Sequence, residues 1–205
     1  ALIQIMSANK YPNTIGGITY NWDTIINGYK TNTYTQDILA SWIRTIGDNC
    51  GMKYKTNSSS SNIYRAKNCL DLYSRYTNLN IIDFPNEVIV SSMLENETPM
   101  YFRGSRIDSI NYHPMDTFGH AWVVDGCIYQ RRLVKISDFN GNLLKQYYQT
   151  RNYVHCNWGW EGSCDGYYSF NVFDLRNGAV LQDENNSSDS KNRYYNLNIK
   201  AIIYN

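Results

Sequence analysis

The hydrophobic pattern of this chain changes at Pro99, from helical spacing before it to strand-like runs after it. Before Pro99, apolar residues recur three and four positions apart, as in the stripe from Ile38 to Ile46. After it, short runs rich in β-branched and aromatic residues are separated by turn residues. Helices followed by a mostly antiparallel sheet define the α+β class. We therefore predict one domain over residues 1–205, mainly helical at 1–98 and mainly β at 99–205.

The helical part is expected to contain helices over 1–10, 36–46, 63–73 and 85–94. Thr35 is predicted to cap the second helix and Gly47 to end it, and Ser61 or Asn62 is predicted to cap the third. Residues 13–34 are turn-rich, and 55–61 and 183–191 are polar loops. Because Ala1 begins an apolar stretch with no cap before it, we expect the first helix to begin upstream of this sequence.

Strands are predicted over 99–104, 120–125, 128–137, 143–149, 152–158, 166–172 and 194–204. Asn140-Gly141 lies between two apolar runs and is a strong hairpin signal. Asp125-Gly126 is interpreted as a turn that ends the strand at 120–125.

Composition excludes several classes of protein. The 205 residues have 42% apolar content and a formal net charge of +1, which is typical of a globular chain. No basic run occurs, so we expect neither nucleic acid nor an anionic membrane as a partner. No apolar stretch is long enough to span a membrane, and the start lacks a signal-peptide pattern. The five cysteines show no zinc spacing, so we expect buried thiols, no metal and no cofactor.

His120 is the residue best suited to carry chemistry. It follows Gly119, which lets a substrate backbone approach closely. A histidine that moves protons needs a group that fixes its tautomer and apolar bulk that excludes water. Asn157 could accept the imidazole Nδ1–H through its amide oxygen, or the indole N–H of Trp158 could make the polar contact, and Trp160 could shield the pair. The structural alternatives are a histidine at a strand start and tryptophans that fill a core or stack on a sugar ring.

Three other polar residues have simpler interpretations. His113, in a loop before proline, is expected to be structural. His155 is expected to pack or to form a hydrogen bond, and Asp165 is expected to form a turn into the next strand.

Two motifs together resemble a known family. Gly-His-Ala-Trp-Val-Val-Asp-Gly at 119–126, and Asn-Trp-Gly-Trp-x-Gly at 157–162 followed by Asp-Gly-Tyr-Tyr at 165–168, resemble the streptopain-like family of cysteine peptidases, within the papain-like superfamily. Further segments resemble the family in the same order: 4–6 with 11–12, 20–22, 36–46, the serine-rich loop and 99–102. The hairpin at 140–141 is an insertion relative to the family.

The resemblance implies a papain-like two-lobed fold, with a helical lobe followed by a mostly antiparallel β lobe, and endopeptidase activity through a thiolate–imidazolium pair. It places the nucleophilic cysteine four residues ahead of Ala1 and the glutamine of the oxyanion hole further upstream. Cys127 and Cys156 are rejected as substitutes, because neither lies at a helix N-terminus and Cys156 faces away from Asn157 in a strand.

The resemblance further implies that His120, Asn157 and Trp158 are catalytic, and that Gly119, Trp160 and Ser58 in the serine-rich loop bind substrate. The expected partners are a protein or peptide substrate and an inhibitory pro-segment, and the expected location is secreted, periplasmic or at the cell surface. The alternatives are a peptidase-like scaffold that binds without cleaving, a carbohydrate-binding module and a papain-like acyl transferase.

Overall fold

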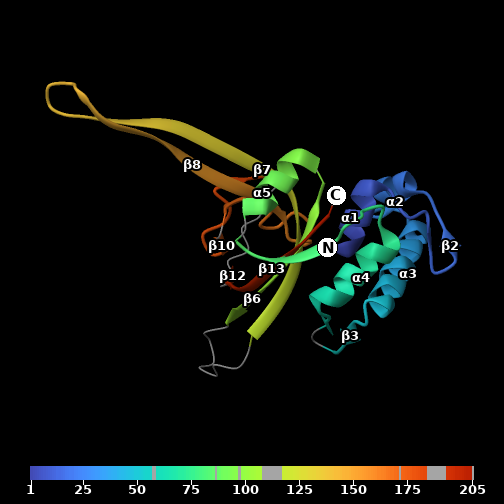
Figure 1. Cartoon of the computed structure of the whole chain (residues 1–205). Helices are drawn as coiled ribbons and strands as arrows, with labels where there is room; N and C mark the ends of the chain where they lie inside the picture. The colour runs from blue at the N-terminus through green and yellow to red at the C-terminus, as the bar shows by residue number, and fades with distance from the viewer. Residues whose placement is uncertain are drawn as a thin grey trace.

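The computed structural model describes residues 1–56, 59–85, 87–96, 98–107, 117–170, 172–183 and 193–204. It is an α+β chain with a large antiparallel sheet, as predicted. The helices are α1 (Leu2–Asn9), α2 (Trp22–Gly28), α3 (Thr33–Asn49), α4 (Ile63–Tyr73) and α5 (Glu87–Asn96). The first four gather on one side of the sheet, and α5 lies close to the sheet itself (Figure 1).

The helix starts follow asparagine caps. Asn21, Asn32 and Asn62 precede α2, α3 and α4, and each side chain accepts the backbone N–H three residues further along. The prediction of Asn62 as one of two candidate caps is confirmed. The prediction that Thr35 caps α3 and Gly47 ends it is wrong, because Asn32 supplies the cap and the helix runs on to Asn49.

Helix α2 was not predicted, because seven residues are too few to show a helical period. Its buried Trp22 packs edge-on against Trp42 of α3, with ring centroids 5.0 Å apart. Helix α5 begins at Glu87, two residues after the predicted start at Pro85.

The main sheet has seven strands in the order β11-β9-β8-β7-β6-β13-β5, and every neighbouring pair is antiparallel. The strands are β5 (Asn80–Asp83), β6 (Met100–Ile107), β7 (Thr117–Ser137), β8 (Leu143–Asn157), β9 (Gly166–Ser169), β11 (Leu181–Gln182) and β13 (Leu197–Ile203). Short pairs join β1 (Thr14–Ile15) to β2 (Ile18–Thr19), β3 (Lys53–Tyr54) to β4 (Ser59–Ser60) and β10 (Phe173–Asp174) to β12 (Tyr194–Tyr195).

Strands β7 and β8 are continuous where the sequence predicted breaks. Asp125-Gly126 is not a turn: the register shifts between Val124 and Gly126, so Asp125 lies at a bulge and β7 continues to Ser137. The hairpin at Asn140-Gly141 is confirmed, with Gly141 at φ +86°. The two strands therefore form one long hairpin.

The centre of the sheet is buried on both faces, because alternate residues point to opposite sides. Phe102 and Trp122 belong to the larger core on one face. Tyr101 and Val123 pack on the other face with Leu70 of α4 and other helical residues. The sheet thereby fixes the helices relative to β6 and β7. Among the described helices, none is both long and apolar enough to cross a bilayer.

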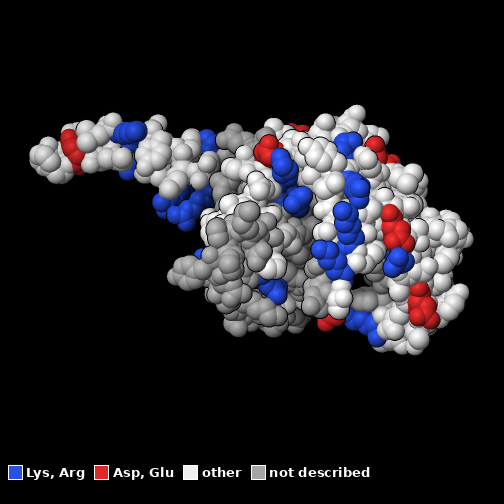
Figure 2. All heavy atoms as spheres, turned by 90° about the horizontal axis from the view of Figure 1, so that it is seen from below, with Lys and Arg blue, Asp and Glu red and all other residues white. Residues whose placement is uncertain are grey.

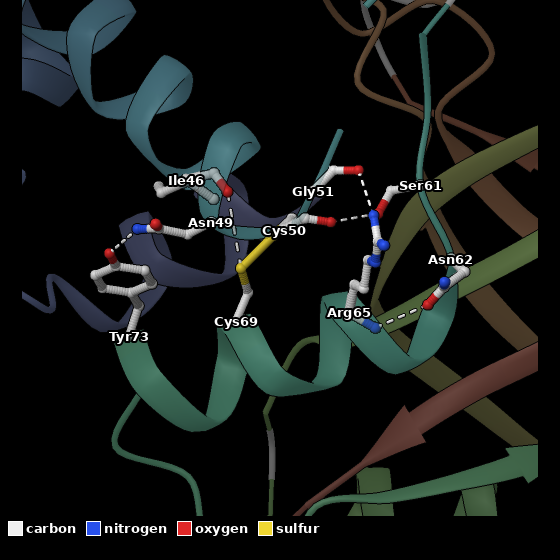
Figure 3. Close-up of a disulfide and its surroundings, with 9 residues drawn as sticks. All are labelled: Ile46, Asn49, Cys50, Gly51, Ser61, Asn62, Arg65, Cys69 and Tyr73. Carbon is white, nitrogen blue, oxygen red and sulfur yellow. Dashed lines mark hydrogen bonds between the residues drawn. A yellow bond between two sulfur atoms is a disulfide. The ribbon is translucent and has the colours of Figure 1, made fainter. Parts of the chain in front are cut away.

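A disulfide links Cys50, at the end of α3, to Cys69 of α4 (Figure 3). The expectation of free thiols is therefore wrong for this pair, because the fold brings together two cysteines that are 19 residues apart. Cys127, Cys156 and Cys164 are free. Next to the disulfide, Arg65 Nη1 donates to the Gly51 carbonyl at 2.8 Å.

Candidate active site

A cleft of about 650 Å³ lies between the helices and the sheet. It is lined by the N-terminal end of α1, the C-terminal half of α3, the segment around β4, and the strands β6 and β7. Its lining includes Ala1, Ile43, Ser59, Tyr101, Gly119 and His120. Ser58 lies outside the described residues, and its neighbours Ser59 to Ser61 line the cleft.

Gly119 lines the cleft from β7. A Cβ added there would meet its nearest protein atoms, the Gly104 carbonyl oxygen and Ser105 Oγ, at 3.8 and 4.0 Å. These are ordinary contacts, so the packing of the protein itself does not require a glycine here. The open space favours the interpretation that Gly119 makes room for something in the cleft.

His120 is held through one ring nitrogen. Its Nε2 lies 3.0 Å from the main-chain carbonyl oxygen of Trp158 at the end of β8. A carbonyl only accepts, so Nε2 carries the proton of the neutral ring and donates it. Nδ1 is then left with a lone pair, which is the form that a general base needs.

The group that holds His120 is neither of the two candidates that the sequence left open, the Asn157 amide and the Trp158 indole. The Oδ1 of Asn157 instead accepts from Gln4 Nε2 at 2.7 Å and from the Gly159 N–H at 3.1 Å. Asn157 therefore joins the end of β8 to α1, and the main chain of the next residue holds the histidine.

Aromatic rings surround the imidazole. The Trp160 ring lies 4.6 Å from it and the Trp158 ring 6.1 Å, measured between centroids. Arg193 lies over Trp160 at 4.2 Å. Trp158 is only 1% exposed, so it offers no face to a sugar ring. Trp160 contacts His120 and is not among the described residues that line the cleft.

Asp165 contributes to the site in a way that sequence reasoning missed. Its Oδ1 accepts the Trp158 N–H at 2.8 Å, and the residue is 6% exposed. It thus holds the backbone of Trp158, the residue whose carbonyl contacts His120. Burial raises the pKa of Asp165, and the Trp158 N–H opposes that rise. Because an Asp-Gly pair is common in turns, nothing in the sequence indicated that Asp165 would also bond the Trp158 backbone.

Comparison with known proteins shows the family of this chain. The model of the peptidase C10 family matches residues 2–168. The chain belongs to the peptidase C10 family. Streptopain of Streptococcus pyogenes and streptopain of its serotype M3 are each 23% identical to it over 158 residues, which cover 73% of this chain and 32% of each relative. The chain thus spans about a third of the length of these relatives. No solved structure matches it.

In this C10-family chain, His120 is a weak base in the absence of an anion. Burial lowers its pKa to about 4, although the hydrogen bond to the Trp158 carbonyl opposes the shift. The imidazole is therefore neutral at pH 7. A negative charge beside Nδ1 would raise the pKa, because it would favour the imidazolium.

Three cysteines near the site or its strands, Cys50, Cys127 and Cys156, are not suited to act on His120. Cys50 lines the cleft but is in the disulfide. Cys156 is fully buried, and burial raises the pKa of its thiol well above the ordinary value. Burial also raises the pKa of Cys127, which lies in the long hairpin. A cysteine that acts as a thiolate nucleophile needs a lowered pKa instead.

His155 is not among the residues that line the cleft. His155 bonds Asp125 through Nδ1 and Asp183 through Nε2, which confirms that it is a hydrogen-bond partner. His113 lies outside the described residues.

Proposed function

We propose that this chain is the acid–base part of a cysteine endopeptidase, and that its nucleophile lies just upstream of Ala1. One observation carries the proposal: the N-terminal end of α1, Gly119 and His120 line the same cleft. His120 Nε2 donates to a carbonyl, so the lone pair of Nδ1 can accept a proton from a thiol.

The position of α1 supports an upstream nucleophile. A cysteine four residues before Ala1 lies about one helical turn, ~6 Å, further along the axis of α1 if the helix continues. The positive end of a helix dipole lowers the pKa of a thiol placed there. The resulting thiolate would raise the pKa of His120 from its low value, and the two would form the ion pair that the family resemblance implies.

The chemistry then proceeds in two steps. The thiolate adds to the peptide carbonyl, the C–S bond forms, and the imidazolium gives its proton to the leaving amine as the C–N bond breaks. Water then loses a proton to His120 and adds to the acyl carbon, the C–S bond breaks, and the carboxylic acid product leaves.

The surrounding residues hold His120 in place during both steps. The Trp158 carbonyl fixes the tautomer and the ring plane, and Trp160 covers the ring. Asn157 has a positioning role through Gln4, which ties β8 to the nucleophile-bearing helix. Gly119 leaves space for the substrate backbone. The neighbours of Ser58, Ser59 to Ser61, line the cleft, which supports a substrate-binding role for Ser58.

The substrate is a protein or peptide, and an inhibitory pro-segment is the natural occupant of the same cleft before activation. Export to the cell surface, the periplasm or the medium is supported by the Cys50–Cys69 disulfide, because such bonds persist in oxidising compartments. The papain-like two-lobed arrangement is supported by a helical part and a β part that meet at the cleft.

The test uses a chain extended upstream by several tens of residues and an epoxide that labels active thiols. We expect labelling of a cysteine just ahead of Ala1, cleavage of casein, and loss of both in His120→Ala with little change in melting temperature. A matched control is His155→Gln, which leaves the cleft intact and retains labelling.

A different outcome would favour the peptidase-like scaffold. An extended protein that binds peptides but neither reacts with the epoxide nor cleaves casein binds without catalysis. Labelling at full rate in His120→Ala would show that the role given to this histidine is wrong.

A further inference from the structure

The long hairpin formed by β7 and β8 stands apart from the body of the protein (Figure 1). The last pair of β8 with β9 is Tyr153 with Ser169, and the Asn152 carbonyl still accepts from the Phe170 N–H. Beyond Asn152, the two long strands pair with each other as far as Ser137 and Leu143. We call residues 129–152 the arm. At about 3.3 Å per residue, the strand from Asn152 to Leu143 extends about 30 Å beyond the sheet.

The tip of the arm is apolar. Phe139 in the turn is 98% exposed, Leu144 66% and Leu143 52%. Ile136, at the end of the other strand, is also exposed. A cluster of large apolar side chains at the end of a projecting hairpin indicates contact with an apolar phase or partner.

The shaft of the arm is basic. The whole arm contains one acidic residue, Asp138 in the turn, and five basic residues, Arg131, Arg132, Lys135, Lys145 and Arg151. The arm thus has a net charge of +4, whereas the whole chain has +1. Figure 2 shows basic side chains along the arm and an acidic side chain near its end. The expectation from the sequence missed this concentration, because the basic residues come together only when the two strands pair.

These charges are available to a partner. Within the described residues, none of the arm's five cations takes part in an ion pair. Arg131 lies over the Tyr148 ring, and Arg132 donates to Gln149 Oε1 at 2.8 Å. Asp138 accepts N–H bonds from Asn140 and Asn142, so its charge is used to hold the turn.

The cations lie on both faces of the arm. Residues paired across the hairpin share a face, so Arg131 and Lys135 lie on one face while Arg132, Lys145 and Arg151 lie on the other. A single protein partner would contact mainly one face. A planar anionic surface that receives the arm end-on would meet both.

The order of residues along the arm matches the order of layers in half a bilayer. The apolar tip comes first, Lys135 and Lys145 follow immediately, and Tyr147 and Tyr148 come next. Apolar side chains enter the acyl region, lysines reach lipid phosphates, and tyrosines favour the interface. We propose that the arm docks the protein on an anionic lipid surface, with Phe139, Leu143 and Leu144 inserted. This inference does not depend on peptidase activity.

The test is flotation of the full chain with vesicles of phosphatidylcholine mixed with phosphatidylserine, compared with vesicles of phosphatidylcholine alone. We expect binding to the anionic vesicles only, weakened by added salt. Replacing Lys135→Gln and Lys145→Gln together should weaken binding about 30-fold, at roughly tenfold for each 1.4 kcal/mol and about 1 kcal/mol for each lysine. Phe139→Ser with Leu144→Ser should abolish it.

Matched controls are Leu72→Ser on α4 and Lys30→Gln, which change an exposed apolar residue and an exposed lysine away from the arm. Both should bind like the wild type. All variants should keep the wild-type melting temperature, because the changed side chains are exposed. The proposal is overturned if the wild type does not bind anionic vesicles, if it binds both kinds equally, or if the arm variants bind normally. Binding to immobilised polyglutamate without binding to vesicles would indicate an acidic polypeptide partner instead.

Discussion

The charge of His155 is predicted to make the stability of this fold depend on pH. Its Nδ1 contacts the carboxylate of Asp125 at the β7 bulge, and its Nε2 contacts the carboxylate of Asp183 after β11 at 3.0 Å. A protonated imidazole donates to both carboxylates, whereas a neutral one donates to only one. Protonation therefore ties three segments of the sheet together at the base of the arm.

The raised pKa of His155 determines how the stability changes with pH. The hydrogen bond to Asp125, with smaller contributions from its charge and from Asp183, raises the pKa of His155 from 6.5 to about 9, although burial opposes the rise. Because the folded pKa lies above the unfolded one, the stabilisation is complete below the unfolded value of 6.5 and is lost as pH rises through about 9.

Exposure to water limits the free energy that the His155 contacts contribute. At 1.36 kcal/mol for each pKa unit, a rise from 6.5 to about 9 corresponds to at most ~3.4 kcal/mol. The Asp125 and Asp183 side chains are 35% and 45% exposed, so water screens the contacts. We therefore expect a contribution of about 1–2 kcal/mol.

The assay is urea unfolding of the wild type and His155→Gln at about pH 6 and about pH 10. The wild type should lose about 1–2 kcal/mol more than the variant between the two pH values, because the other titrating groups are common to both proteins and cancel. Asp183→Asn should remove part of the difference. Equal losses in wild type and His155→Gln would refute the reasoning.

Two further predictions concern the cleft and the helices. Gly119→Ala in the extended protein should reduce kcat/KM roughly 10- to 100-fold by displacing the substrate, while the free energy of unfolding stays the same or rises by up to about 1 kcal/mol. A clear loss of stability would show that the glycine is structural. Replacing Cys50→Ser and Cys69→Ser together should lower the free energy of unfolding by about 3 kcal/mol, from the loop entropy of a 19-residue separation. Calorimetry should give the double variant and the reduced wild type the same lowered melting temperature, and an unchanged one would contradict the assignment.

Local patterns were enough to predict much of the fold. The apolar stripe from Ile38 to Ile46, the cap at Asn62 and the turn at Asn140-Gly141 each depend on neighbours in the sequence, and the structure confirms them. Helix α2 was missed because seven residues show no period. The bulge at Asp125 was taken for a turn, because the same dipeptide serves both structures.

In the candidate site, too, some features could be predicted from the sequence and others depend on the tertiary structure. The sequence by itself placed His120 at the start of a predicted strand directly after Gly119, and it supplied the pattern of the Asn157-Trp158 segment; the structure shows that β7 begins earlier and includes both residues. Only the tertiary structure decided that the Trp158 carbonyl, and not the Asn157 amide, contacts His120. A backbone carbonyl is present in every residue, so no sequence pattern marks the one that will be used.

Long-range pairing decided the remaining features. The Cys50–Cys69 bond and the gathering of five cations on the arm both bring together residues that are distant along the chain. Composition records that such residues are present, but their meeting depends on helix packing and on the register of β7 with β8. Local propensity acts over a few residues, whereas a disulfide, a cleft or a charged arm is created by contacts that exist only once the chain has folded.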